Sequence, residues 1–226
     1  MCGRITQKSN PHRLGLGLTT VSLVEPLHAS PRYNGAPGQP HWLIRQNPET
    51  GERSLDQLSW GLIPRWVKAP DGGRKPINAR AETISSLPSF RDAYKRRRAL
   101  LPVDNFFEWK AIKGVSPKQP YAIGMASGEP FAIAAIWENW QHPETAEWVR
   151  TFAVVTTTAN ELISDIHDRM PVIIPPESYD HWLGTLDPDP RGLLVPFPAP
   201  LMAAWPISTR VNKVANDDES ILAATA

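Results

Sequence analysis

Short apolar runs that are rich in β-branched and aromatic residues recur along the chain and alternate with Gly, Pro and Asn. Such runs are typical of β-strands, because these side chains pack well on a pleated surface and the intervening residues favour turns. The pattern predicts strands at residues 41–46, 57–63, 121–125, 131–137 and 152–158. Residues 99–110 predict two further strands, interrupted near Asp104 and Asn105.

Helices are predicted at fewer places. Ser89 is placed to cap a helix that ends in the cations of residues 95–98, which are favourable at the carboxyl end of a helix dipole. Residues 160–166 and 177–183 are the other candidates, the second directly after two prolines. Many strands with scattered short helices predict an α+β architecture rather than regular βαβ winding.

Composition indicates one folded domain spanning residues 1–226, since the length suits a single core and neither a repeat nor a linker divides the chain. Proline accounts for 24 residues, about twice its usual share. Because 41% of the chain is hydrophobic and nine tryptophans are present, this proline-rich chain is expected to fold rather than to be disordered. Residues 67–76 and 186–200, where prolines gather, are predicted surface loops.

Charge and cysteine content exclude several classes of protein. Lys and Arg number 24 against 23 Asp and Glu, so a nucleic-acid site has to be a local patch. One cysteine excludes an internal disulfide or a Cys-rich zinc module, and no metal-ligand spacing or phosphate loop is present, so we expect no metal and no cofactor. Without a signal peptide or an apolar run near the ~20 residues that span a membrane, a soluble cytoplasmic protein is expected.

The sole cysteine, Cys2, is followed by Gly3 and lies where removal of the initiator methionine is usual, since the second residue is small. An N-terminal cysteine carries an amine and a thiol on adjacent carbons, and this pair condenses with an aldehyde to an imine and then to a thiazolidine ring. The α-amine has a pKa of ~7.7–8.0, against ~10.4 for lysine, and is therefore substantially nucleophilic at cellular pH. A structural cysteine is the alternative interpretation, because free cysteines are commonly buried.

Three other residues have the chemistry of a reaction centre. Glu108 lies among aromatic residues, where burial would raise its pKa toward neutrality and suit it to proton transfer; a surface glutamate on an alternating strand is the alternative. His167 has acidic and basic neighbours that would set its charge, or it is a structural histidine. Asn34 precedes Gly35, and because Asn-Gly is a strong turn former, a turn residue is the alternative interpretation of Asn34.

A second group of residues has the chemistry of a single-strand binder, in which cations contact phosphates and aromatic rings stack on bases. In extended form residues 76–83 place Asn78, Arg80 and Glu82 on one face, because side chains alternate along a strand. Surface salt bridges and core tryptophans explain the same residue types. The candidates for contacts to DNA are Arg4, Arg80, Arg169, Trp60 and Trp66.

Six motifs, in order along nearly the whole chain, together resemble the SRAP family of SOS-response-associated peptidase proteins, which act as abasic-site shields. They are residues 1–4 (MCGR), 32–37 (RYNGAP), 60–61 (WG), 77–83 (INARAET), 107–110 (FEWK) and 166–171 (IHDRMP). Residues 207–212 (ISTRVN) and 216–218 (NDD) extend the likeness toward the end of the chain.

The resemblance implies a mixed α+β fold with a barrel-like, largely antiparallel β core flanked by short helices. It implies that Cys2, after removal of Met1, crosslinks to the ring-opened sugar of an abasic site in single-stranded DNA. Glu108 would act as acid and base, His167 would assist proton transfer, and Asn34 would hold the cysteine amine or the sugar. Residues implied to contact the DNA are Arg4, Asn78, Arg80 and Arg169 at phosphates, and Trp60 and Trp66 at bases.

The resemblance further implies a monomer that associates with the nucleoid when it is bound to DNA, with removal of Met1 by its own site and a lyase activity as accessory reactions. Two other classes remain open from the residues. One is an N-terminal-nucleophile amidohydrolase or peptidase, since glutamine amidotransferases also begin with cysteine and glycine. The other is a noncatalytic module that binds single-stranded DNA. The preference for strand or junction, the fate of the crosslink and any partner at the replication fork are not predicted.

Overall fold

The computed structural model describes residues 2–15, 20–21, 31–68, 75–114, 116–184 and 189–225. Five strands form a closed ring in which β11, β10, β7, β4 and β5 pair antiparallel in that order. A parallel pairing of β5 with β11, which sets Trp60 opposite Phe152, closes the ring. The strands of this barrel are β4 (Pro40–Gln46), β5 (Arg53–Trp60), β7 (Arg98–Val103), β10 (Phe131–Gln141) and β11 (Trp148–Thr158).

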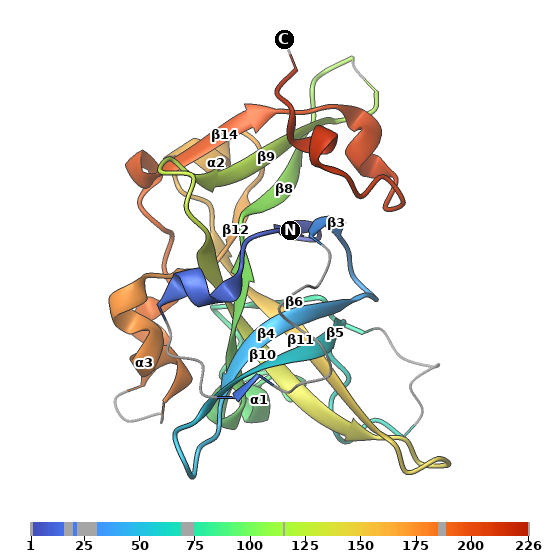
Figure 1. Ribbon diagram of the computed structural model, residues 1–226, viewed down its shortest axis with the longest axis vertical. Helices are drawn as coiled ribbons and strands as arrows, with labels where there is room; N and C mark the ends of the chain where they lie inside the picture. Colours follow the sequence, from blue (N-terminus) through green and yellow to red (C-terminus); the bar gives the residue numbers. More distant parts are fainter. Residues whose placement is uncertain are drawn as a thin grey trace.

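A second, five-stranded antiparallel sheet lies above the barrel in Figure 1. Its central strand β8 follows β7 after a single residue, Asp104, so the two sheets are covalently joined at this point. In order across the sheet the strands are β14 (Met202–Pro206), β9 (Gln119–Met125), β8 (Asn105–Lys110), β1 (Ile5–Gln7) and β3 (Arg32–Gly35).

The remaining elements are short. Four strands add to the barrel: β2 (Thr20–Val21), β6 (Asn78–Arg80), β12 (Arg169–Pro171) and β13 (Ile173–Ile174). The α-helices are α1 (Arg91–Arg96), α2 (Glu161–Ser164) and α3 (Tyr179–Leu183). The 3-10 helices are η1 (Pro11–Leu14), η3 (Pro176–Ser178), η4 (Pro190–Leu193), η5 (Ala199–Leu201), η6 (Thr209–Asn212) and η7 (Glu219–Leu222).

Strand β7 shows how the barrel is held together, since all six of its residues are buried. Successive side chains of a strand point to opposite faces, so a strand that is buried throughout has to be covered on both sides. Leu100 packs in one apolar cluster with Tyr94 and Trp182 of the helices α1 and α3. Leu101 packs in a second cluster that also contains Cys2.

The predicted α+β architecture is confirmed, as are seven strands at the predicted places and the break at Asp104, and several strands are longer than predicted. The prediction for residues 57–63 was partly wrong, because β5 begins at Arg53 and ends at Trp60. Asn160 caps α2 by accepting from the backbone N–H of Ile163 at 3.0 Å. The prediction for the first helix was partly wrong: Phe90, not Ser89, precedes α1, and Arg98 already belongs to β7. The predicted loops at residues 67–76 and 186–200 lie partly outside the described residues, and the described part of the second holds η4 and η5.

Gly35, at the end of β3, faces the buried ring of His41. A Cβ atom added at Gly35 would lie 2.4 Å from Cε1 of His41. The ring cannot move away freely, because its Nε2 lies 3.1 Å from the carbonyl oxygen of Ala36 and its edges contact Trp60 and Phe152. Even one methyl group is therefore too large at this position.

Gly35→Ala is expected to lower the free energy of unfolding by about 1–3 kcal/mol, the usual cost of overpacking a core. Gly192→Ala is the matched control, since among the described residues no atom beyond its own neighbours in the chain lies within 4 Å of its Cβ position. Chemical denaturation of both variants tests this expectation. Equal stability of the two variants would show that the core around His41 yields.

Candidate active site

Cys2 lies between the barrel and the second sheet and has no exposed surface. The pairing of β1 with β8, with Ile5 opposite Phe106, places it there. The backbone N–H of Phe107 donates to the carbonyl oxygen of Arg4 at 3.1 Å, which continues this pairing toward Cys2. Burial, and next the negative charge of Glu108, raise the pKa of the Cys2 thiol well above its usual value, so the sulfur is protonated at neutral pH.

Glu108 lies on β8 with 2% of its surface exposed. Burial raises the pKa of its carboxyl group to about 7, and the charge of Asp168 adds to this effect. The aromatic neighbours in the sequence had indicated such a shift, and the direction is the one predicted. A carboxyl group that titrates near neutral pH can both give and take a proton.

His167 follows α2, and its charge environment overlaps that of Glu108. Its Nδ1 accepts from the backbone N–H of Arg169 at 3.0 Å, which places the proton of the neutral ring on Nε2. Burial lowers the pKa of His167, while the nearby charge of Asp168 acts in the opposite direction. The contact of Nδ1 with Asp168, at 2.9 Å, would become an ion pair only on protonation. His167 is therefore neutral at neutral pH and has Nε2–H as its donor.

Asn78 is the amide that contacts Cys2. Its Nδ2 donates to the carbonyl oxygen of Cys2 at 2.9 Å, and its buried Oδ1 accepts from no other group in the described part of the chain. Strand β6 holds Asn78 by pairing parallel to β11, and Nε1 of Trp60 donates to the carbonyl oxygen of Ile77 at 2.9 Å. The alternation predicted for this segment is confirmed for Asn78 and Arg80, since Ala79 between them is buried. Strand β6 ends before Glu82.

Asn34 occupies another place than the one predicted for it. Its Oδ1 accepts from Arg4 at 2.8 Å, and its Nδ2 lies within 3.1 Å of three carbonyl oxygens, those of Val211, Lys213 and Asn216. Both ends of the amide are thus engaged away from Cys2. Among the described residues, the side-chain amide that donates to Cys2 is that of Asn78.

Three arginines were predicted to contact phosphates, and their surroundings differ. Arg80 is exposed on β6. Arg4 is half-buried and donates to uncharged acceptors, among them the carbonyl oxygen of Val211 at 2.6 Å. Arg169 forms a two-pronged ion pair with Glu82, whose pKa this contact lowers, and donates to the carbonyl oxygen of Thr156 at 2.7 Å. A phosphate would have to displace Glu82 from Arg169, so Arg80 and Arg4 are the better candidates.

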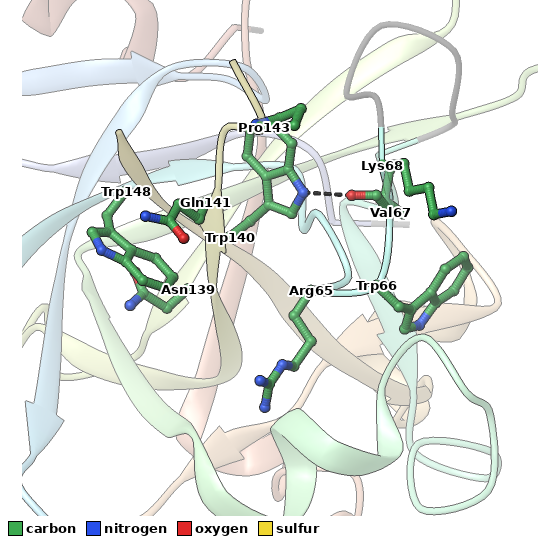
Figure 2. A pocket seen from close by; sticks show the side chains of 9 residues that line it. All are labelled: Arg65, Trp66, Val67, Lys68, Asn139, Trp140, Gln141, Pro143 and Trp148. Carbon is green, nitrogen blue, oxygen red and sulfur yellow. Dashed lines mark hydrogen bonds between the residues drawn. The ribbon is translucent and has the colours of Figure 1, made fainter. Parts of the chain in front are cut away.

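The two predicted stacking tryptophans have opposite surroundings. Trp60 is 1% exposed and stacks on Phe152 with ring centroids 5.8 Å apart. It is a core residue, and the prediction that it stacks on bases is wrong for this conformation. Trp66 is 61% exposed and borders a pocket of about 440 Å³ in which Arg65 and Lys68 are the cations (Figure 2). The pocket is lined by Arg65, Trp66, Val67, Lys68, Asn139, Trp140, Gln141, Pro143 and Trp148.

In the part of the chain that the structure describes, no three His, Cys, Asp or Glu residues come together as metal ligands. The same residues include no helix with the length and apolar character of a membrane span. Asp217 supports this region and was not among the predicted residues: its Oδ1 accepts from the backbone N–H groups of Tyr33, at 2.5 Å, and of Asn34, at 2.7 Å. The motif at residues 216–218 was the only signal for it.

The chain is similar to proteins of one known family. A family model described as SOS response associated peptidase (SRAP) matches residues 1–214. The chain is 38% identical over 225 residues to the abasic site processing protein YoqW of Bacillus subtilis (strain 168), covering 98% of this chain and 99% of YoqW. It is 34% identical over 187 residues to the abasic site processing protein YedK of Escherichia coli (strain K12), covering 81% and 79% of the two chains.

A solved structure of a protein from Bacteroides thetaiotaomicron has the same fold, with a TM-score of 0.87, 26% identity and complete coverage of both chains. The family model and the relatives each cover most of the sequence. The chain therefore belongs to the SOS response associated peptidase (SRAP) family.

The raised pKa of Glu108 predicts a pH dependence of stability. Between the usual carboxyl pKa of 4.5 and about 7, the unfolded chain has lost this proton while the folded chain keeps it. The free energy of unfolding therefore falls as the pH rises through this window, by about 3 kcal/mol from this one group. Glu108→Gln removes that term.

Denaturant unfolding at pH 4.5 and pH 7.5 measures the change for wild type and Glu108→Gln. The difference between the two proteins isolates Glu108 from His41, whose buried ring has its pKa lowered to about 4 and acts with the opposite sign. The wild type is expected to lose more stability on going to pH 7.5 than the variant. Parallel curves would mean that Glu108 is ionised throughout this range in the folded protein.

Proposed function

We propose that this protein processes abasic sites in single-stranded DNA by bonding covalently to them through Cys2. The observation that carries the proposal is the burial of Cys2 in one site with Glu108, a carboxyl group whose pKa lies near 7. Membership of the SRAP family and the names of YoqW and YedK, both abasic site processing proteins, support it.

The chemistry requires a free nitrogen at Cys2, which is an amide while Met1 is attached. The untrimmed chain buries Cys2 completely, so access for a sugar has to come with removal of Met1 or movement of neighbouring residues. The freed amine attacks the aldehyde of the ring-opened sugar, and loss of one water gives an imine. The thiol then adds across the imine, with its sulfur bonding to carbon and its proton passing to nitrogen, and a thiazolidine results.

Glu108 suits both proton transfers of this sequence. In its acid form it protonates the hydroxyl group that leaves as water, and in its anionic form it accepts the proton of the Cys2 thiol. A carboxyl group with an ordinary pKa would lack the acid form at neutral pH. Because the thiol itself is held protonated by burial, an adjacent base is needed for ring closure.

Asn78 and His167 complete the site in this proposal. Asn78 fixes the backbone of Cys2 and presents its buried Oδ1 as an acceptor for the freed amine or a sugar hydroxyl group. His167 presents Nε2–H to the sugar oxygen. Ring closure protects the strand, because an open imine hydrolyses readily and promotes β-elimination, whereas a thiol on the adjacent carbon acts at high effective concentration.

The DNA strand is proposed to run along the exposed side of β6, where Arg80 contacts phosphates, with Arg4 close to the reacting nucleotide. Trp66 supplies a stacking surface beside the cations Arg65 and Lys68. Peptidase activity is confined in this proposal to removal of Met1. Incubation with glutamine separates the amidohydrolase alternative, which predicts ammonia release and no bonded DNA.

Cys2→Ser is expected to form only the imine with an abasic oligonucleotide, since a hydroxyl group closes the ring far less readily than a thiol. After denaturation with heat, wild type should retain a protein–DNA band on a gel and the variant should lose it. Borohydride added before heating should restore the band for Cys2→Ser by reducing the imine. A heat-stable band from the untreated variant would contradict the thiazolidine.

Glu108→Gln is expected to slow crosslinking by about 100-fold or more, the range usual for loss of a general acid–base group. Affinity for an oligonucleotide with a reduced, unreactive abasic analogue should stay within a few-fold, because the amide has the same shape. Rapid-quench gels and fluorescence anisotropy measure the two quantities. Equal losses in both would assign Glu108 a role in binding or folding only.

A further inference from the structure

Residues 208–217, here called the C-terminal clasp, contact three parts of the second sheet: Arg4 directly before β1, the edge strand β3 and the central strand β8. Val211 of the clasp packs against Phe107 of β8 in an apolar cluster. At its end, Asp217 accepts from the backbone N–H groups of Tyr33 and Asn34 at 2.5 and 2.7 Å. The clasp is thereby anchored to β3, the edge strand next to β1.

The clasp holds the side chain of Arg4 with groups that carry no charge. Nη1 of Arg4 donates to the carbonyl oxygen of Val211 at 2.6 Å and to Oδ1 of Asn34 at 2.8 Å, and Nη2 lies 3.4 Å from the carbonyl oxygen of Asn212. Asn34 is held in turn by three carbonyl oxygens of the same segment. Backbone carbonyls belong to a fixed chain, so this cage sets the position of the guanidinium group narrowly.

Arg4 is also in contact with the nucleophile. Its backbone N–H donates to the sulfur of Cys2. Hydrogen bonds thus link Asp217 to the backbone of Asn34 and the side chain of Asn34 to that of Arg4, whose own backbone N–H meets the Cys2 sulfur. The bonds from Asn34 N–H to Asp217 and from Arg4 to Asn34 are 2.7 and 2.8 Å long, and although Asp217 is exposed, Asn34 is buried, where hydrogen bonds are better defined than at the surface.

We propose that the C-terminal clasp is a positioning device for ring closure. The clasp holds Arg4 so that the Cys2 sulfur faces the imine carbon, and Asp217 is the positioning residue that anchors the clasp. This inference rests on the proposed function. Imine formation needs only the amine, whereas ring closure needs the sulfur in line with the C=N bond. The clasp acts on the second step, in which the S–C bond forms and the thiol proton passes to the imine nitrogen.

Asp217→Ala removes the acceptor for Tyr33 and Asn34, and the test follows both steps in the protein without Met1. The adduct that borohydride traps reports the imine, and the adduct that survives heat without borohydride reports the closed ring. We expect ring closure to slow by about 3- to 10-fold, the effect of losing one or two hydrogen bonds, so that trappable imine accumulates early in the reaction. The rate of imine formation should change less than two-fold.

Asp217→Asn retains an acceptor oxygen and is expected to close the ring at close to the wild-type rate. Asp180→Ala is the control, since this carboxylate is exposed and pairs with Arg53, and neither residue belongs to the clasp. Should Asp217→Ala unfold at the assay temperature, Asn216→Ala is the second variant; it removes the donor to the carbonyl oxygen of Arg210, at 2.7 Å, and loosens the clasp. The same shift toward imine is expected there.

The clasp and the proposed function fail in different ways. If the wild type forms neither adduct, the proposed function is wrong. If the wild type closes the ring and Asp217→Ala does so at the same rate, only the clasp is wrong. A fall of both steps by the same factor in Asp217→Ala also overturns the inference, because it would indicate general loss of structure, which the melting temperature of each variant registers independently.

Discussion

The pairing of β1 with β8 is the constraint on which the rest of the structure depends. It brings the second residue of the chain against a carboxylate more than one hundred residues away and buries both. Burial then sets their chemistry: it holds the thiol of Cys2 protonated and raises the pKa of Glu108 to about 7. Without burial, neither the thiol nor the carboxyl group would have its pKa raised in this way.

The two faces of β8 pack against different parts of the protein. Phe106 packs in the cluster that contains Cys2 and the inward residues of the barrel, whereas Phe107 packs on the opposite face with Ile207, Val211 and Ile221 of the C-terminal region. The barrel therefore supports the reacting groups from one side, and the end of the chain supports Arg4 from the other. This division explains why both ends of the sequence and its middle are needed for one small site.

The long strands were predictable because their apolar runs are buried on both faces and give a strong local signal, as in β7 and β10. Strands β1, β3 and β6 have three or four residues, too few for a periodic pattern, and pairing with distant strands defines them. For the site, residue type and neighbours indicated Cys2 and the raised pKa of Glu108. The residue types could not show which side-chain amide contacts Cys2, since Asn78 is 76 residues away in the sequence. Nor could they decide between a base-stacking and a core position for Trp60.

Intact mass spectrometry of the protein without Met1, mixed with an oligonucleotide that carries one abasic site, tests the central claim most directly. The proposed chemistry predicts a gain equal to the mass of the oligonucleotide less one water, because only imine formation releases water. Peptide mapping should place the adduct on Cys2. A protein of unchanged mass, or an adduct located on another residue, would contradict the account.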